Sequence, residues 1–217
     1  MKVLIATPSY DGRLDVWYTN SLINTVQLAQ EHGVTIHPVF LAYDALIQRA
    51  RNCLFKIAID GGYDHMIFID SDMEWNPDWV MKLINSKEDV IGGTARKKTD
   101  DAEIYVVNTN DLTIHQNGFI KCNSLGTGFV KISRKAFEKL WLASPEYKNE
   151  GEVHRMVCDV QIIDGQLCSE DTVLFRRLRQ LGFDSWLDPT MTCGHIGTKK
   201  FLGNFEAFHK RLSVKAA

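Results

Sequence analysis

The sequence predicts an α/β fold of Rossmann-like type, with a mostly parallel central sheet flanked by helices. In the first half of the chain, short apolar runs alternate with segments of helical periodicity, which is typical of this class. The run Met66–Ile69 is apolar at every position, as expected of a strand covered on both faces in a parallel sheet. The 217 residues, 45% of them hydrophobic, can form a large core and predict a single domain over residues 1–217.

The first half of the chain is predicted to alternate strand and helix. Gly33 is expected to end the first helix, and the helical spacing of Leu46, Ala50, Leu54 and Ile57 predicts the second. The predicted elements are a strand over 2–6, a loop over 7–13, a helix over 20–32, a strand over 34–40, a helix over 44–60 and a strand over 66–69.

The second half begins with a clear helix start and is less regular afterwards. Asn76-Pro77-Asp78 supplies an N-cap, a proline at N1 and an acid in the first turn. Ser133 and Ser169 are predicted to cap two later helices. The other predicted elements are a strand over 89–93, short strands and loops over 94–116, a strand over 129–132, a loop over 144–149, a returning segment over 183–188 and a helix around Phe205 and Phe208.

Composition narrows the classes of function. The net charge of -2 and the pI near 6.4, without a long basic block, argue against a nucleic-acid partner. The five cysteines form no C-x-x-C pair, which indicates reduced thiols in place of a zinc or redox site. The apolar N-terminal run is too short for a signal peptide, and no segment has the length of a membrane span. We therefore expect a soluble, cytoplasmic protein.

Two acids directly follow the apolar run that ends at Ile69. In an extended segment, residues two apart point to the same side, so Asp70 and Asp72 are expected to project together from the carboxyl end of the strand. Open α/β sheets bind ligands at this edge. Two like charges about 6–7 Å apart repel by roughly 2–3 kcal/mol at an effective dielectric near 20, and a divalent cation would remove that penalty. This favours a metal site over the alternative of two solvated loop acids.

With Asp70-Ser71-Asp72 in this position, the chain resembles the nucleotide-sugar glycosyltransferases of the GT-A fold, whose DXD motif these residues would supply. The opening segment Val3–Asp11 and the downstream Gly126–Phe129, Glu170-Asp171 and His195 resemble the family as well, so the resemblance spans most of the chain. It implies a GT-A-like domain that holds Mn²⁺ or Mg²⁺ against the diphosphate of a sugar donor. In size the chain is similar to small transferases of bacteria and large viruses, chlorella viruses among them.

Two other classes of function stay open. Haloacid-dehalogenase-like phosphatases also end a strand in an acidic motif, D-x-D-x-[TV], but position 74 here is Glu and the motif comes after several elements. A non-catalytic domain that binds a sugar nucleotide or a glycan would show binding without turnover. The acids and the histidine converge on one mechanism, which favours an enzyme.

The resemblance assigns the loop after the first strand to the nucleoside. Thr7 and Pro8 would contact it through their backbone, Tyr10 would stack on or flank the base, and Asp11 would bind the ribose or the base edge. A turn built from Pro8, Asp11 and Gly12 explains the same residues without a ligand.

Further donor contacts are expected from the helix over 44–60. Arg49 and Arg51 lie on its polar face, and Arg49 is the choice for a contact with the diphosphate or with Asp70. A solvated helix face explains both arginines nearly as well.

Three more residues complete the expected donor site. Ser71 lies between the two acids, and Lys199 could neutralise diphosphate charge, although an exposed lysine explains it too. Gly126 would let the backbone approach a sugar closely, unless it only forms a tight bend.

The acid pair Glu170-Asp171 follows the predicted cap Ser169. Acids in a first helical turn gain about 0.3–1 kcal/mol from the helix dipole, which explains the pair without catalysis. The resemblance places such a pair beneath the acceptor, where an inverting enzyme needs a base. Asp171 is then the first candidate for the base and Glu170 the second; in a retaining enzyme either would orient the acceptor.

His195 would be the third metal ligand beside Asp70 and Asp72, and imidazole suits Mn²⁺ better than Mg²⁺. The resemblance thus implies a hexosyl- or deoxyhexosyltransferase that uses Mn²⁺ or Mg²⁺. It would move a sugar from a nucleoside diphosphate, with UDP expected, to a hydroxyl of a glycan or glycoprotein acceptor. The sugar, the acceptor and the stereochemical outcome stay open.

Overall fold

A computed structural model describes residues 1–100 and 102–215 of the chain. Over these residues the helices are α1 (Val16–Glu31), α2 (Ile47–Asp60), α3 (Pro77–Asn85), α4 (Arg134–Ala143), α5 (Glu170–Gln180) and α6 (Phe205–Lys215). The strands are β1 (Lys2–Ser9), β2 (Thr35–Ala42), β3 (His65–Ile69), β4 (Met73–Glu74), β5 (Val90–Ala95), β6 (Val107–Asn108), β7 (Ile120–Cys122), β8 (Ser124–Leu125), β9 (Phe129–Ser133), β10 (Glu146–Asn149), β11 (Glu152–Arg155), β12 (Gln161–Ile163), β13 (Gln166–Cys168), β14 (Ser185–Ile196) and β15 (Lys200–Phe201).

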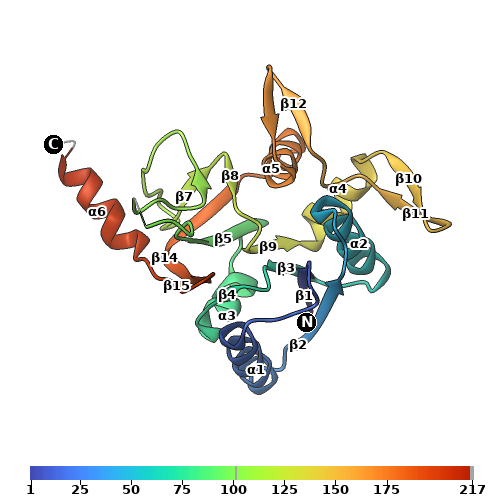
Figure 1. Ribbon diagram of the computed structural model, residues 1–217, viewed down its shortest axis with the longest axis horizontal. Coiled ribbons are helices and arrows are strands. Elements are labelled where there is room, and N and C mark those ends of the chain that lie inside the picture. Colours follow the sequence, from blue (N-terminus) through green and yellow to red (C-terminus); the bar gives the residue numbers. More distant parts are fainter. Residues whose placement is uncertain (101, 216–217) are drawn as a thin grey trace.

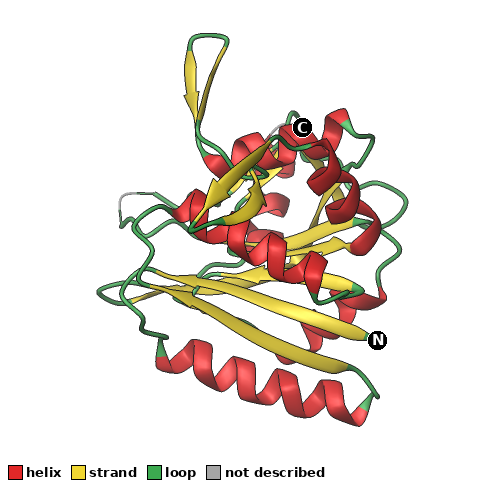
Figure 2. Ribbon diagram, turned by 90° about the vertical axis from the view of Figure 1, so that its right-hand side faces the viewer, coloured by secondary structure: helices red, strands yellow, loops and turns green. Residues whose placement is uncertain are grey.

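The main sheet runs in the order β15-β14-β5-β9-β3-β1-β2. Strands β2, β1 and β3 are parallel to one another, and so are β5 and β14. Strand β9 lies between these two groups and is antiparallel to both of its neighbours. Helices cover both sides of the sheet (Figures 1 and 2). The predicted α/β class with a mostly parallel central sheet is confirmed, and the arrangement is consistent with a Rossmann-like GT-A fold.

The sheet separates two apolar cores. In β1, Val3 and Ile5 point to the core that contains residues of α1 and α3, whereas Leu4 and Ala6 point to the core built with α2, α4 and α5. Successive strand residues face opposite sides, so a strand between two cores must be apolar throughout. Burial of each such aliphatic side chain contributes about 1.5–3 kcal/mol. This explains why the apolar runs of the sequence do not alternate with polar residues.

Several polar residues gather at one edge of the sheet. Strands β1, β3, β5 and β14 run in the same direction, so their carboxyl ends meet at this edge, and the reversed strand β9 begins there. Tyr10, Asp70 and Lys98 follow three of these strands, His195 is the last but one residue of the fourth, and Gly128 precedes β9. Ligands of open α/β sheets bind at such an edge.

Both helices of the first half begin at other residues than predicted. Helix α1 begins at Val16 and not at residue 20, because the Asp15 side chain accepts a hydrogen bond from the backbone N–H of Trp17 at 2.8 Å and caps the helix. Helix α2 begins at Ile47, because Asp44 lies in the preceding loop and accepts the backbone N–H two residues further on. The predicted bounds of both helices were wrong by three or four residues at this end.

Strands extend into three segments where the prediction had none. Strand β1 continues to Ser9, so Thr7 and Pro8 belong to it and pair with β2. The returning segment is the twelve-residue strand β14, which ends at Ile196. The predicted loop over 144–149 contains β10, which forms a hairpin with β11. Its turn residues Glu150 and Gly151 have φ angles of +51° and +87°, the conformation that two-residue hairpin turns need.

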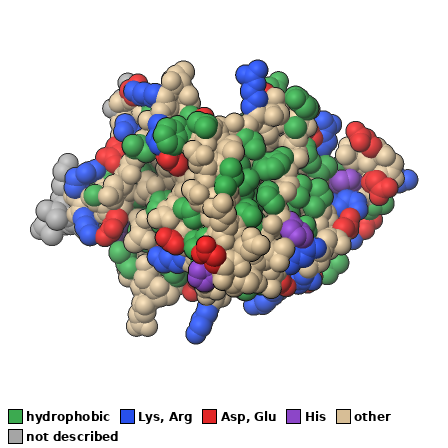
Figure 3. Space-filling model, turned by 90° about the horizontal axis from the view of Figure 1, so that it is seen from below, with side chains coloured by type: hydrophobic (Ala, Val, Ile, Leu, Met, Phe, Trp, Pro, Cys, Tyr) green, Lys and Arg blue, Asp and Glu red, His purple; other side chains and the backbone are tan. Residues whose placement is uncertain are grey.

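The surface carries charges of both signs. On the face seen from below in Figure 1, acidic and basic side chains are interspersed around exposed apolar ones, without a block of one sign (Figure 3). Exposed apolar side chains of α1 and β2 include Val16, Trp17, Ile23 and Phe40. Within the described ranges, none of the helices combines the length and the apolar character that a membrane crossing requires.

Candidate active site

A cavity of about 190 Å³ lies at the carboxyl edge of the sheet, beside the end of β3. Its wall includes five residues that the sequence predicted for the site, namely Asp70, Gly126, Glu170, Asp171 and His195. These residues come from the end of β3, the loop before β9, the start of α5 and the end of β14. The tertiary structure therefore brings together candidates that lie up to 125 positions apart in the chain.

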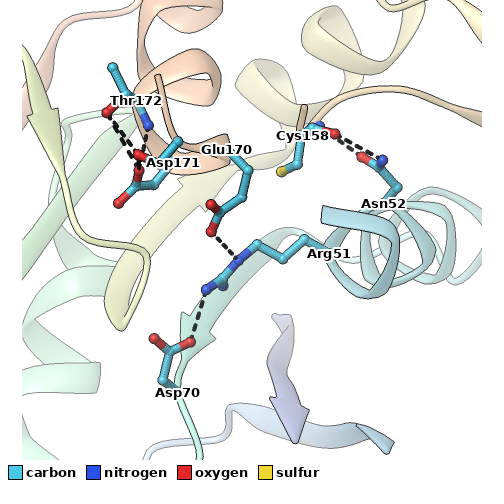
Figure 4. Close-up of polar contacts among 8 residues, drawn as sticks. Arg51, Asn52, Asp70, Cys158, Glu170, Asp171 and Thr172 are labelled. Atoms are coloured by element: carbon cyan, nitrogen blue, oxygen red, sulfur yellow. Dashed lines mark hydrogen bonds and ion pairs between the residues drawn. The ribbon is translucent and has the colours of Figure 1, made fainter. Parts of the chain in front are cut away.

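Arg51 is the cation of this cavity. Its guanidinium lies between two of the predicted carboxylates, with Nη2 3.2 Å from Asp70 Oδ1 and Nε 3.4 Å from Glu170 Oε1 (Figure 4). The residue is only 3% exposed. Burial acts to lower the pKa of the guanidinium, but nearby negative charge, foremost that of Asp70, outweighs it, and the pKa lies above its ordinary value. Arg51 thus holds α2, β3 and α5 at fixed positions around the cavity.

The choice of Arg49 as the arginine near Asp70 was wrong. Arg49 donates from Nε and Nη2 to the two carboxylate oxygens of Asp44, both at 2.8 Å, on the exposed side of α2. Helical spacing explains the difference, because Arg51 lies on the same face as the buried Leu54 and Phe55.

The two acids of the motif lie in a turn and not in an extended segment. The backbone N–H of Met73 donates to the carbonyl of Asp70 at 3.1 Å, which closes the turn, and Asp70 N–H donates to the carbonyl of Gly128 at 3.2 Å. The prediction that both carboxylates project from the same side of an extended strand was therefore wrong, because the backbone forms a turn here. Ser71 fixes the turn from the other side, since its carbonyl accepts from the N–H of Asp15 at 3.1 Å.

Asp72 lies beside His195 because β14 pairs with the short strand β4 directly after the turn. The N–H of Ile196 donates to the carbonyl of Asp72 at 2.8 Å. Asp72 Oδ2 is 3.8 Å from His195 Nε2 and 2.5 Å from the ammonium nitrogen of Lys98. Asp72 thus contacts a different cation from Asp70.

The geometry of Asp72 and His195 fits two ligands of one cation. His195 Nδ1 is 2.9 Å from the carbonyl oxygen of Arg96, which can only accept, so Nδ1 carries a proton and Nε2 is the ring nitrogen left to bind a cation. Asp70, the third predicted ligand, binds Arg51 here. Within residues 1–100 and 102–215, no three His, Cys, Asp or Glu side chains are arranged so that they could hold a metal ion together. The oxygen atoms of a diphosphate or of water could complete the coordination of a cation held by Asp72 and His195.

Ser169 occupies the predicted N-cap position of α5, but its side chain makes no capping hydrogen bond to the helix backbone; the acid pair forms the first turn. Asp171 Oδ1 accepts hydrogen bonds from the Ser169 hydroxyl and from the N–H of Thr172, the latter at 2.6 Å. These bonds orient the Asp171 carboxylate (Figure 4). Asp171 also lines a second hollow of about 180 Å³, which it shares with Gly126. The carboxylate therefore lies where two adjoining hollows meet.

Side chains of neighbouring residues pack closely against the glycines before β9. A Cβ atom on Gly128 would lie 2.3 Å from Met73 Cε and 3.3 Å from Asp70 Oδ2, and one on Gly126 would lie 2.6 Å from Val106 Cγ1. Both glycines line the cavity. Their lack of a side chain explains how the loop can pack directly against the acidic turn.

The residues predicted for the nucleoside differ in accessibility. Thr7 is buried, and its hydroxyl lies 2.5 Å from that of Tyr18, so both side chains are engaged inside the protein. Pro8 is a buried residue of β1. Asp11 accepts the N–H two residues further on and thus forms the expected turn. Tyr10 is 75% exposed and offers a free aromatic face at this edge of the sheet.

Lys199 does not contact the predicted metal ligands. Its ammonium is 2.5 Å from Asp100 Oδ1, and more than half of its side chain is exposed. Lys98 takes the position beside Asp72 that the sequence had not assigned to any residue. The Lys98 contact arises because the loop after β5 folds onto the acidic turn, and no pattern in the sequence indicates it. Arg51 is different, because its helical spacing to buried residues could have identified it.

Comparisons with known proteins address the fold. No family model matches the sequence, and no curated protein matches it. Among solved structures, A197 from STIV is similar at 19% identity with a TM-score of 0.57, over 94% of this chain and 95% of that chain. The two chains share one fold. A glycosyltransferase involved in the glycosylation of the major capsid of PBCV-1 is similar at 10% identity with a TM-score of 0.33, over 63% of this chain and 61% of that chain.

Proposed function

We propose that this protein is a metal-dependent glycosyltransferase that moves a sugar from a nucleoside diphosphate, UDP, to a hydroxyl of a glycan or glycoprotein. The proposal rests on one observation: Asp70, Glu170, Asp171 and His195 line a single cavity at the ligand-binding edge of the sheet, and Asp72 lies beside it. Carboxylates accept hydrogen bonds from sugar hydroxyls and, with imidazole, bind divalent cations.

The donor would lie along the carboxyl ends of β1 and β3. Tyr10 would cover the base, and Asp72 and His195 would hold Mn²⁺ or Mg²⁺ against the diphosphate. When bound, the metal would neutralise the charge that grows on the leaving diphosphate. Because Asp70 is paired with Arg51, its role here would be to position that guanidinium and the turn, and not to bind the metal alone.

The acceptor would enter beside Asp171, at the hollow lined also by Gly126. In an inverting reaction the acceptor oxygen forms a bond with the anomeric carbon, its proton passes to the Asp171 carboxylate, and the bond to the phosphate oxygen breaks with its electron pair. The hydrogen bonds from Ser169 and Thr172 would hold the carboxylate in position for this transfer. In a retaining reaction Asp171 would orient the acceptor.

Calorimetric titration of UDP, with and without Mn²⁺, tests the donor site on the wild type and on Asp72→Ala. We expect UDP binding that requires both Mn²⁺ and Asp72. The matched control is Asp164→Ala, which changes an exposed acid in the turn between β12 and β13 and should leave UDP binding unchanged. Binding that is indifferent to Mn²⁺ and to Asp72, or the absence of binding by any nucleoside diphosphate, would contradict the proposal.

A further inference from the structure

Lys98 contacts the oxygen atom that a metal ion at Asp72 would need. Its ammonium nitrogen is 2.5 Å from Asp72 Oδ2, and the same oxygen faces His195 Nε2 at 3.8 Å. The ammonium therefore neutralises the charge of Asp72. A divalent cation bound to Asp72 and His195 would meet this positive charge at close range.

Charge around the cavity favours a further cation. Four carboxylates, those of Asp70, Asp72, Glu170 and Asp171, lie in or beside the cavity, and the contacting cations among the described residues are Arg51 and Lys98. Two positive charges thus face four negative ones, which leaves a deficit that one divalent ion would fill. Such an ion would repel Lys98, which is the more exposed of the two cations.

The two cations differ in their freedom to move. Arg51 is 3% exposed and fixed between two carboxylates, whereas about a third of the Lys98 side chain is exposed. Lys98 belongs to the loop after β5 and carries its charge on a flexible four-carbon stem. An exposed ion pair of this kind contributes only about 0.2–1 kcal/mol, so Lys98 can leave Asp72 at little cost.

The end of β14 makes room for this lysine. A Cβ atom on Gly197 would lie 3.1 Å from Lys98 Cδ, which is tighter than an ordinary contact. A side chain in place of Gly197 would therefore displace the Lys98 stem by a few tenths of an ångström.

We propose that Lys98 competes with the divalent cation for Asp72 and, once displaced, binds the diphosphate of the donor. The proposal rests on the glycosyltransferase function proposed above and names the residue that couples metal binding to donor binding. In this sequence of events the ammonium protects Asp72 while the site is empty. It then adds a positive charge to the diphosphate when the metal has taken its place.

The test measures Mn²⁺ binding without nucleotide, from the electron paramagnetic resonance signal of free Mn²⁺. We expect Lys98→Met to bind Mn²⁺ about fivefold more tightly than the wild type, because the competing charge is gone. Lys98→Arg should stay close to the wild type. The matched control is Lys121→Met, which removes a lysine paired with Asp184 at 2.8 Å on another part of the surface and should leave Mn²⁺ affinity unchanged.

The second measurement is UDP affinity at saturating Mn²⁺, where Lys98→Met should bind UDP about fivefold more weakly and Lys98→Arg should restore binding. Thermal melts of all variants establish that they are folded. Equal Mn²⁺ affinity in the wild type and Lys98→Met would overturn the proposal. So would UDP binding that needs Lys98 but no Mn²⁺, because Lys98 would then be a permanent counter-ion.

The two levels of proposal fail in different ways. If Mn²⁺ and UDP bind the wild type and Asp72→Ala binds neither, the donor site stands even when Lys98→Met behaves like the wild type. If Lys98→Met binds Mn²⁺ more tightly but no variant binds a nucleoside diphosphate, the competition stands and the glycosyltransferase function does not.

Discussion

Arg51 is the side chain on which the geometry of the cavity depends most directly. It is the buried partner of both Asp70 and Glu170, and it joins α2 to the end of β3 and the start of α5. Removing one partner of a buried ion pair leaves the remaining charge without compensation, which costs more than the pair contributes. The protein therefore requires an arginine here for stability as well as for the shape of the site.

Arg51→Met should lower the free energy of unfolding by about 2–4 kcal/mol, because Asp70 and Glu170 lose their shared cation. Urea denaturation measures the loss. Arg49→Met is the matched control on the same helix, since it removes only an exposed pair with Asp44 and should cost clearly less. Equal losses in the two variants would contradict the role assigned to Arg51.

Asp171→Asn should reduce turnover by at least about 100-fold in an inverting reaction, because the amide cannot take the acceptor proton. UDP affinity should stay within about twofold, since the donor would contact other residues. Steady-state kinetics and calorimetry separate the two effects. Asp164→Asn, at an exposed turn, should change neither quantity. Unchanged turnover of Asp171→Asn would exclude it as the base.

At the scale of residues, sequence reasoning identified side chains better than it identified their contacts. Asp70, Glu170, Asp171 and His195 were predicted for one site, and they line one cavity. Their partners were missed. Arg51 was assigned to the polar face of its helix, although its spacing to Leu54 and Phe55 indicates the buried face, and Lys98 comes from a loop with no periodic pattern. Contacts between distant segments depend on how the elements pack.

At the scale of elements, Asn52 links helix α2 to the segment that leads to the acid pair. Its side chain accepts from the N–H of Cys158 at 2.7 Å and donates to the carbonyl of the same residue at 3.0 Å (Figure 4). Both Asn52 and Cys158 are buried, so each backbone group would lack a partner without this amide. One side chain thus replaces the pairing that a strand would otherwise supply.

Asn52→Ala should lower the free energy of unfolding by about 2–4 kcal/mol, because it leaves a buried N–H and a buried carbonyl unpaired. Chemical denaturation measures this loss, and hydrogen exchange should show faster exchange of the Cys158 amide. Asn20→Ala, at an exposed position of α1, is the matched control and should leave stability nearly unchanged or slightly higher. Unchanged exchange of the Cys158 amide would show that the Asn52 hydrogen bonds are not formed in solution.

The elements that the sequence missed have a common physical reason. The loop predicted over 144–149 has no apolar alternation, yet β10 and β11 pair because the turn at Glu150 and Gly151 brings them together. Likewise, β14 extends to Ile196 because β5, β4 and β15 pair with successive parts of it. Pairing partners far along the chain decide where such strands end, and propensity alone does not contain that information.

At the scale of the whole molecule, buried titratable groups set the dependence of stability on pH. Burial raises the pKa of the Cys122 and Cys158 thiols to about 12, and it also raises the pKa of Cys193. Burial, with a smaller effect of Glu103, raises the pKa of Tyr105 to about 12. Burial lowers the pKa of the Lys131 ammonium to about 8. Above neutral pH, the thiols and the Tyr105 phenol lower the free energy of unfolding as the pH rises, whereas Lys131 raises it.

The free energy of unfolding should fall as the pH rises from about 8.5 to 10.5, measured by urea denaturation in a reducing buffer. In this window the unfolded chain releases the thiol protons that the native state keeps, and each such group lowers stability by up to about 1.4 kcal/mol per pH unit. Lys131 has the opposite effect, because the native state releases its proton near pH 8 and the unfolded chain only near 10.5. The three thiols and Tyr105 together outweigh the opposite effect of this one lysine, so the net stability falls.

Cys122→Ala should make the decrease with pH shallower by about the contribution of one group. A stability that rises over the same window would show that Lys131 dominates and that the thiols are more accessible than the structure has them.

The sequence by itself determined the fold class, the edge of the sheet at which the cavity lies, and the three acids and the histidine that line this cavity. Apolar runs and helical spacing are local properties, so they can be read without knowing how the elements pack. Only the tertiary structure decided that Asp70-Ser71-Asp72 is a turn, that Arg51 lies between two carboxylates and that Lys98 neutralises Asp72. Each of these depends on contacts between distant segments, which are selected by packing and charge compensation and are not local properties of the sequence.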